Sequence, residues 1–248
     1  MLLGLMGAMP EEMDKIIDAL TDKKVVERGS RLYYRGKLYG QEVVAVFSRW
    51  GKVAAATTAT NLIVEFGVDR IVFTGVAGAI SDDLNIGDVV IAQRLFQHDM
   101  DARPLMRRFE IPLTGKTSYE ISEQNSGLMV EAVHNFLKNN IQLRNFALVQ
   151  HAPTPKLMLG DIASGDLFIS GTEMKKALIR NLPSVVCAEM EGAAVAQVCN
   201  DFDVPLTVVR IISHTADEQA HTSAIGFVNQ YAGEYSLAIL REYIQLLK

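Results

Sequence analysis

The sequence predicts an α/β fold with a largely parallel sheet. The first observation is a set of continuous apolar runs rich in valine and isoleucine, such as Arg70–Thr74 and Leu206–Ile212. Runs of this kind, without polar alternation, are typical of strands that are covered on both faces. The second observation is that helical patterns separate these runs along the whole chain. Because no linker or internal repeat divides the sequence, we expect one domain over residues 1–248.

Each element is expected from its own local pattern. Leu2–Met6 is an apolar run that is followed by acidic residues and lacks a basic start, so it indicates a buried first strand instead of a signal peptide. Later strands are expected where β-branched and aromatic residues cluster, at Arg31–Leu38, Gln41–Phe47, Arg70–Thr74, Asp88–Phe96, Phe146–His151, Val185–Ala188 and Leu206–Ile212. Helices are expected where apolar residues recur at helical spacing, at Glu11–Leu20, Val53–Phe66, Gly127–Lys138, Glu173–Asn181, Ala193–Phe202 and Ala224–Leu247.

The composition is that of an ordinary globular protein, with 49% apolar and 21% charged residues. A formal net charge of −5 argues against a nucleic-acid partner, because nothing in the chain neutralises a polyanion. No apolar run approaches the roughly 20 residues that cross a bilayer, so no membrane partner is expected. Cys187 and Cys199 both lie in apolar segments, which indicates a reducing compartment and a cytoplasmic protein.

One long segment, Asp101–Asn125, interrupts the alternation of strands and helices and is therefore expected to be functional or interfacial. Within it, Leu113–Thr117 resembles the end of a phosphate-binding loop, but Glu110 stands where that loop needs a glycine. Just before it, His98 and Asp99 are metal-ligand types, but strand alternation sends them to opposite faces. No metal site is expected.

The most informative segment is Ala188–Gly192, which places Glu189 and Glu191 between an apolar strand and a small-residue helix. Residues two apart in an extended chain point to the same face. Open α/β sheets bind ligands at the carboxyl ends of their strands, and acids buried there are costly unless something polar is bound. A sugar with vicinal hydroxyls is one explanation of the pair. The alternative is an acid pair that complements the helix dipole.

Two further segments end apolar strands and carry small or acidic residues. Gly7–Glu12 contains Glu12 after a proline, which indicates either a catalytic acid or an ordinary helix start. The segment with Val76, Ala77 and Gly78 either forms a tight turn or lets a flat base approach the backbone closely.

A fourth strand end lies in Val208–Asp217. Arg210, alone in an apolar run, needs a buried carboxylate, and we expect Glu12 or Glu191 to supply it. His214 either satisfies the backbone at the strand end or acts as an acid, because the ordinary pKa of histidine lies near neutrality.

Six motifs occur in order: Gly7–Glu12, Gly51–Ala55, Thr74–Gly78, Ser164–Ile169, Ala188–Gly192 and Arg210–Ser213. Together they resemble those of the bacterial 5′-methylthioadenosine/S-adenosylhomocysteine nucleosidases, of the purine nucleoside phosphorylase-like superfamily, over nearly the whole chain. The resemblance implies a three-layer αβα fold with a mixed, mostly parallel sheet. It implies hydrolysis of the N-glycosidic bond by water instead of phosphate, a part in methionine salvage, and no cofactor or metal. It also implies a homodimer in which Asp101–Phe109 completes the partner's 5′-substituent pocket.

The resemblance assigns roles residue by residue. Glu12 matches the general base that deprotonates the attacking water, and Arg210 matches the arginine that supports the site carboxylate and the water. Glu191 matches the carboxylate that binds the ribose hydroxyls, with Met190 packed on the nucleoside. Cleavage passes through a ribosyl cation, which flanking carboxylates stabilise. Phe168 and Ile169 match the wall and the backbone hydrogen-bonding edge of the purine site. The expected substrate-binding residues also include Val76, Ala77, Gly78, Glu189, Ser213 and Trp50.

His214 departs from the family, which has an aspartate at this position that accepts from the adenine amino group and donates to N7. Three hypotheses follow: protonated His214 donates to N7, Asp217 takes over the role, or the base specificity has changed. An imidazolium only donates, which suits a 6-oxo purine such as that of inosine or a futalosine-like nucleoside. A non-catalytic nucleoside-binding protein is the further alternative. Trp50 and Ala224 also depart from the family, in the region of the 5′ substituent.

Overall fold

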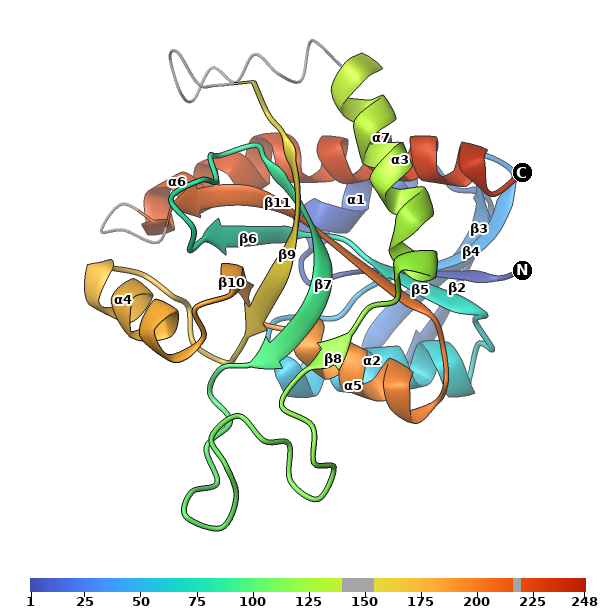
Figure 1. Cartoon of the computed structure of the whole chain (residues 1–248). Helices are drawn as coiled ribbons and strands as arrows, with labels where there is room; N and C mark the ends of the chain where they lie inside the picture. Colours follow the sequence, from blue (N-terminus) through green and yellow to red (C-terminus); the bar gives the residue numbers. More distant parts are fainter. Residues whose placement is uncertain (140–153, 216–219) are drawn as a thin grey trace.

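The computed structural model describes residues 1–139, 154–215 and 220–248, which form one sheet with helices on both faces (Figure 1). The strands are β1 (Leu3–Gly7), β2 (Thr21–Arg28), β3 (Arg31–Leu38), β4 (Gln41–Phe47), β5 (Arg70–Phe73), β6 (Val76–Ala79), β7 (Val89–Gln97), β8 (Tyr119–Glu120), β9 (Leu157–Ser164), β10 (Val185–Glu189) and β11 (Leu206–Thr215). The helices are α1 (Pro10–Asp18), α2 (Lys52–Val64), α3 (Glu123–Asn139), α4 (Thr172–Asn181), α5 (Gly192–Asp201), α6 (Ala220–Phe227) and α7 (Gly233–Leu246), with a π-helical turn at Val228–Ala232 between the last two.

The strands follow the order β2-β3-β4-β1-β5-β11-β6-β10-β9-β7-β8, and β11 also pairs with β7. The extra pairing closes β11, β6, β10, β9 and β7 into a ring, from which the remaining strands continue as an open sheet. Among the described strands, six pairings are parallel and five are antiparallel. This confirms the predicted α/β class with a mixed sheet in which parallel pairing predominates.

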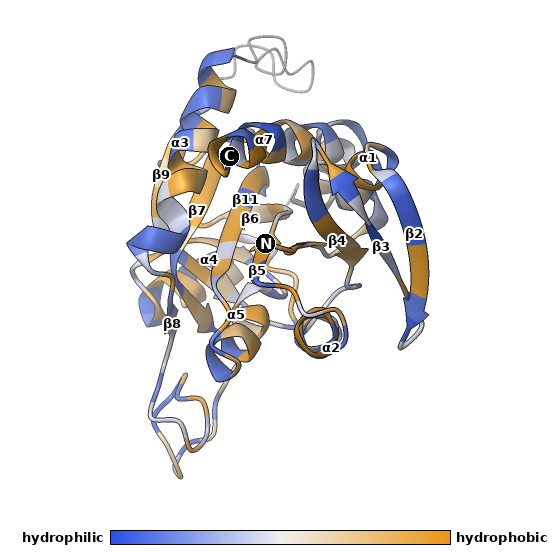
Figure 2. Cartoon of the chain, turned by 90° about the vertical axis from the view of Figure 1, so that its right-hand side faces the viewer, coloured by the Kyte–Doolittle hydropathy of each residue, from blue (hydrophilic) through white to orange (hydrophobic). Residues whose placement is uncertain are grey.

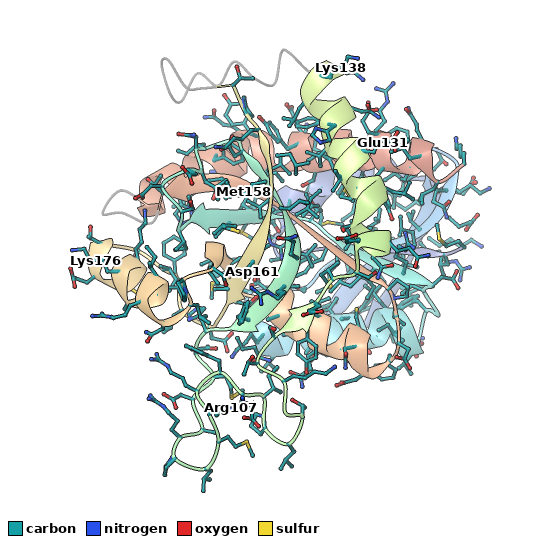
Figure 3. All side chains as sticks on the ribbon, viewed as in Figure 1. Arg107, Glu131, Lys138, Met158, Asp161 and Lys176 are labelled. Carbon is teal, nitrogen blue, oxygen red and sulfur yellow. The ribbon has the colours of Figure 1, made fainter. Side chains whose placement is uncertain are left out.

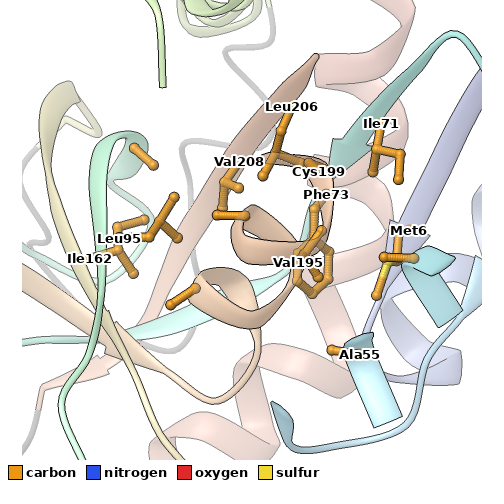
Figure 4. Packing of buried hydrophobic residues seen from close by; sticks show 14 of the residues in the cluster. Met6, Ala55, Ile71, Phe73, Leu95, Ile162, Val195, Cys199, Leu206 and Val208 are labelled. Carbon is orange, nitrogen blue, oxygen red and sulfur yellow. The ribbon is translucent and has the colours of Figure 1, made fainter. Parts of the chain in front are cut away.

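The sheet separates the two larger hydrophobic cores, which gives the three predicted layers, and a smaller third cluster lies beside α4. Successive residues of β1 face opposite cores: Leu5 packs on the side of α1, α3 and α7, and Met6 packs on the side of α2 and α5 (Figure 4). Val72 and Phe73 of β5 divide in the same way. Because both faces of these strands are covered, their sequences are continuously apolar, as predicted.

Several elements differ from the sequence-based expectations. The edge strand β2 is not predicted because its exposed residues are mainly charged; in Figure 2 it is blue at both ends with an orange stretch between them. Strands β6, β8 and β9 were missed as well, and the strand expected at Phe146–His151 lies outside the described residues. The expected final helix is split by the π-helical turn, although Tyr235 and Tyr243 of its apolar stripe are fully buried as predicted.

The topology brings the ends of many strands to one region. The carboxyl ends of β1 and β5 are adjacent because the two strands are parallel neighbours. The carboxyl ends of β7, β9 and β10 are likewise adjacent. Within the described residues, no helix is long and apolar enough to cross a membrane.

Candidate active site

Glu12 lies in the first turn of α1, and its side chain folds back onto the start of its own helix. One carboxylate oxygen, Oε2, accepts the backbone N–H groups of Ala8 and Met9, at 2.7 and 3.0 Å. The other, Oε1, accepts the N–H of Val76 at 2.9 Å across the β5–β6 turn. Gly75 allows this approach, since a Cβ there would lie 2.7 Å from Oε1. The acid is therefore fixed at the junction of β1, β5 and β6.

The protonation of Glu12 reflects two opposing influences. Its side chain is almost fully buried, and burial raises the pKa of the carboxyl above its ordinary value. The positive charge of Arg210 and the three backbone N–H groups oppose this rise. A carboxylate with a raised pKa is suited to take a proton from a bound water.

Glu189 and Glu191 do not form the pair on one face that the sequence suggested, because strand β10 ends at Glu189 and Glu191 is the N-cap residue of helix α5. The Glu189 carboxylate accepts the N–H groups of Glu191 and Gly192, at 3.0 and 2.8 Å, and the hydroxyl of Ser164. It thus holds the start of α5 in the manner of a capping acid. The contacts of Glu189 therefore fit the alternative interpretation, an acid that complements the helix dipole.

Arg210 is the buried cation of the site, and its partner differs from the expected one. Its Nη2 donates to Glu189 Oε2 at 2.8 Å, whereas Glu12 and Glu191 had been the predicted partners. Its Nη1 donates to the carbonyl oxygens of Phe73 and Val209, both at 3.1 Å. The expectation of a direct bond to Glu12 or Glu191 is wrong, because β11 and β10 flank β6 and carry Arg210 and Glu189 to the same place. The Arg210 charge still lowers the pKa of both Glu12 and Glu191.

Glu191 faces a different donor. Its Oε1 accepts the N–H of Gly51 at 2.7 Å, in the turn that begins α2. Burial and the neighbouring Glu189 charge raise the pKa of Glu191 to about 8, against the opposing effects of the Gly51 N–H and Arg210. Three buried acids thus lie near one buried arginine in the described part of the chain. The raised pKa of Glu12 and of Glu191 reflects this, and a cationic group bound beside them would favour their ionised forms.

His214 closes the other side of the site. Its Nδ1 lies 2.9 Å from the Ser213 hydroxyl. Its ring lies against Gly78, where an added Cβ would be 2.5 Å from Nε2. The ring of Phe168 stacks on the imidazole, with centroids 5.2 Å apart and planes 28° from parallel. Because Gly78 has no side chain, a flat ring can lie against its backbone, and in this structure that ring is the imidazole of His214.

The remaining predicted residues surround this centre less tightly. Ala77 and Ile169 are buried, Val76 and Met190 are half-buried, and Phe168 and Trp50 are 41% and 66% exposed. Asp217, the proposed substitute acid, lies outside the described residues. His98 and Asp99 belong to no group of three metal-binding side chains in the described residues. Asp99 instead bonds to Lys52, at 2.6 Å.

One contributor was not assigned a role from the sequence. Ser164, at the end of β9, donates its hydroxyl to Glu189 and accepts the N–H of Ala193 at 2.7 Å. It therefore links β9 to the start of α5 beside the buried ion pair. The available signal was its place as the first residue of the motif Ser164–Ile169.

The fold and this site define a class of protein: residues 2–245 match the model of the phosphorylase superfamily, and the chain belongs to that family. Among curated proteins, it is 35% identical to an aminodeoxyfutalosine nucleosidase of Helicobacter pylori over 231 residues, which is 93% of each chain. It is 33% identical to a 5′-methylthioadenosine/S-adenosylhomocysteine nucleosidase of Staphylococcus haemolyticus over 99% of this chain and 100% of that protein.

Solved structures show the same relationship. A Helicobacter pylori nucleosidase mutant with 5′-methylthioadenosine in its active site superposes with a TM-score of 0.85, at 32% identity and with 98% of each chain covered. An S-adenosylhomocysteine nucleosidase of Streptococcus pyogenes superposes with a TM-score of 0.86, at 30% identity, over 100% of this chain and 98% of that one. The predicted family membership is thereby confirmed.

Proposed function

We propose that the protein hydrolyses the N-glycosidic bond of 5′-methylthioadenosine and S-adenosylhomocysteine, releasing adenine and a 5′-thio-substituted ribose. The observation that carries this proposal is a pair of buried acids held by backbone N–H groups, Glu12 by that of Val76 and Glu191 by that of Gly51. Both have a raised pKa, and the charge of Arg210 acts on both. The full-length similarity to nucleosidases supports the same reaction. Neither metal nor cofactor takes part in the proposed chemistry.

Glu12 is the base in this mechanism. Its carboxylate takes a proton from a water molecule as the water attacks the anomeric carbon. The ribosyl group passes through a cationic transition state, and the ionised carboxylate of Glu191 stabilises it. Glu191 accepts hydrogen bonds from the ribose hydroxyls, while Arg210 and Glu189 hold the surrounding strands without contacting the substrate.

The contacts of Glu12 also favour water over phosphate as the nucleophile. The N–H groups at a helix N-terminus normally form an anion site. Here Glu12 itself occupies the N–H groups of Ala8 and Met9. A phosphate ion would have to displace the carboxylate and lie beside its negative charge, which is unfavourable.

His214 acts on the departing base. As an imidazolium it donates from Nε2 to N7 of the purine, which makes the base a better leaving group. The Ser213 hydroxyl beside Nδ1 orients the ring for this role. Phe168 and Ile169 form the wall and the edge of the purine site.

A second candidate substrate class is the 6-oxo purine nucleosides. The specific observation is His214 itself, because an imidazolium can donate to both N7 and O6 but cannot accept from a 6-amino group. The chain is also 33% identical to a mutant of a Helicobacter pylori protein described as a futalosine hydrolase. The two structures superpose over 99% of each chain. The binding-protein alternative is disfavoured because buried charges are costly to retain without use.

The cellular setting follows from the same proposal. The protein is cytoplasmic, takes part in methionine salvage and forms a homodimer. The segment after β7 reaches the partner's 5′-substituent pocket. Within it, Leu105 is 87% exposed and the side chain of Arg107, labelled in Figure 3, is 72% exposed.

Base release from 5′-methylthioadenosine and from inosine, in phosphate-free buffer with chromatographic detection, tests the function. Adenine from the first substrate alone supports the main proposal. Hypoxanthine from the second supports the 6-oxo candidate. Release from neither substrate would contradict both.

A further inference from the structure

Three segments that are distant in sequence meet at Lys52, the first residue of α2. Its ammonium Nζ donates to Asp99 Oδ1 at 2.6 Å and to Gln97 Oε1 at 3.3 Å, both at the end of β7. Its backbone N–H donates to Asp166 Oδ1 at 2.8 Å, just beyond β9. The other oxygen of Asp99 accepts the backbone N–H of Asp166 at 2.9 Å. Lys52, Asp99 and Asp166 therefore form a closed triangle of contacts, which we call the Lys52 triangle.

This triangle lies between the two halves of the proposed substrate site. Gly51, which precedes Lys52, donates its N–H to Glu191, the proposed ribose-binding acid. Asp166 is two residues before Phe168, the proposed purine wall. The turn at residues 51–52 thus holds Glu191 with one N–H and the start of the purine-binding segment with the next. A Cβ at Gly51 would lie 2.9 Å from Asp166 Oδ1, so the approach is close.

We propose that Lys52 and Asp99 are positioning residues that fix the segment 165–169 relative to Glu191. This inference rests on the proposed function for the identity of the ligand, and on the Lys52 triangle for the geometry. Substrate recognition needs the ribose and the purine to be held at a set distance, and the two groups that hold them come from different elements. The Lys52 triangle joins those elements directly.

The partial burial of the ion pair gives it more weight than a surface pair. The side chains of Lys52 and Asp99 are 16% and 20% exposed. The hydrogen bond from Lys52 holds the pKa of Asp99 below its ordinary value although burial opposes it. Without Lys52, the Asp99 carboxylate loses its charged partner, and its hold on the Asp166 N–H weakens.

A matched control exists on the same two strands. Arg94 of β7 donates from Nε to Asp161 of β9 at 3.0 Å, and Asp161 lies on the β9 ribbon beside β7 (Figure 3). Arg94→Met removes an ion pair between β7 and β9 without touching the carboxyl ends of these strands, where Asp99 and Asp166 follow. It controls for a general loss of strand pairing.

The test compares Lys52→Met, Asp99→Ala, the double variant, Lys52→Arg and Arg94→Met by steady-state kinetics on 5′-methylthioadenosine. We expect Lys52→Met and Asp99→Ala each to raise KM by about 10-fold, with a smaller effect on kcat, because a displaced binding segment weakens productive binding. The double variant should lose little more than either single variant, since both disrupt one set of contacts. Lys52→Arg should recover most of the KM change, and Arg94→Met should leave KM unchanged.

Hydrogen exchange supplies a readout that does not depend on activity. The Asp166 amide, bonded to Asp99, should exchange faster in Lys52→Met and Asp99→Ala but not in Arg94→Met. Unchanged exchange would overturn the proposed contacts, and faster exchange with an unchanged KM would overturn the positioning role.

If the wild-type protein releases no base, the proposed function fails on its own. The dissociation constant for adenine then replaces KM, and equal affinity in all variants overturns the inference.

Discussion

Arg210 and Glu189 form an ion pair at 2.8 Å, with side chains only 2% and 3% exposed. The pair joins the middle of β11 to the end of β10, and the guanidinium also lies 4.1 Å from the centre of the Phe73 ring. The pair influences both proposed functional acids: Glu189 accepts the N–H of Glu191, and the charge of Arg210 lowers the pKa of Glu12 and of Glu191. Its own charges are neutralised within the protein and need no ligand.

Breaking this pair should mainly affect stability. Arg210→Met leaves the Glu189 charge buried without its cation, and we expect the free energy of unfolding to fall by about 3–5 kcal/mol. Denaturant unfolding followed by circular dichroism measures the change. Arg28→Met, which removes an exposed pair with Glu65, is the control and should cost at most about 1 kcal/mol. Equal costs for the two variants would contradict the central role given to the pair.

Glu12→Gln should abolish the proposed base. The amide oxygen can still accept the N–H groups of Ala8 and Met9, whereas the amide NH2 cannot accept that of Val76. Because the side chain cannot take a proton, kcat should fall by about 10²–10⁴-fold. Glu11→Gln, at the exposed neighbouring position in the same helix turn, is the matched control. Single-turnover release of adenine measures both variants, and similar rates in the two would exclude Glu12 as the base.

The raised pKa of Glu191 predicts opposite pH trends in activity and in stability. Since the folded-state value of about 8 lies above the ordinary value of 4.5, the Glu191 contribution to the free energy of unfolding is present at low pH. That contribution is lost as the pH rises from about 4.5 to about 8. Activity should instead rise over the upper part of this range, because the ionised carboxylate stabilises the cationic transition state.

Thermal unfolding and kcat/KM, measured from about pH 5 to about pH 9, check both trends. In Glu191→Gln, the fall in stability across this range should be smaller than in the wild type. A wild-type protein that gains stability through this group as the pH rises would show that the carboxyl has a lowered pKa.

His214→Asp restores a side chain that both donates and accepts. We expect the ratio of kcat/KM for 5′-methylthioadenosine to that for inosine to rise by about 10-fold or more, because an unpaired amino group costs about 1–3 kcal/mol. The two substrates are compared on the same enzyme preparations. If the ratio stays constant, His214 does not select the base.

Gly75→Ala tests how closely the β5–β6 turn approaches Glu12. The added Cβ would lie 2.7 Å from Oε1, so the carboxylate must shift and kcat should fall by about 10-fold or more. Gly127→Ala in helix α3 meets nothing within 4 Å and should stabilise the protein by up to about 1 kcal/mol. Full activity in Gly75→Ala would show that Glu12 tolerates displacement.

The sequence predicts those parts of the fold that short-range patterns determine. The two-sided burial of β1 and β5 is visible as continuous apolar residues, and most expected helices lie within a few residues of the observed ones. Strand β6 was hidden because Val76–Ala79 is short and contains only small residues. Strand β2 was hidden because an edge strand with exposed charged residues lacks the apolar pattern of the core strands.

In the candidate site, too, residues in short local motifs were predictable and contacts between distant segments were not. Glu12 and Glu191 stand in contiguous motifs at element boundaries, so their positions were predictable. The partner of Arg210 was not, because its pairing with Glu189 depends on the spatial order of β10, β6 and β11. The Lys52 triangle joins residues up to 114 positions apart, and no local pattern indicates it.

The most direct test of the account follows the oxygen of water labelled with the heavy isotope ¹⁸O during turnover of 5′-methylthioadenosine with phosphate present. The account predicts free adenine and a 5′-methylthioribose whose anomeric hydroxyl carries the label, and loss of this product in Glu12→Gln. A ribose 1-phosphate product, or labelled product formed at the same rate by Glu12→Gln, would contradict the claim that Glu12 activates water.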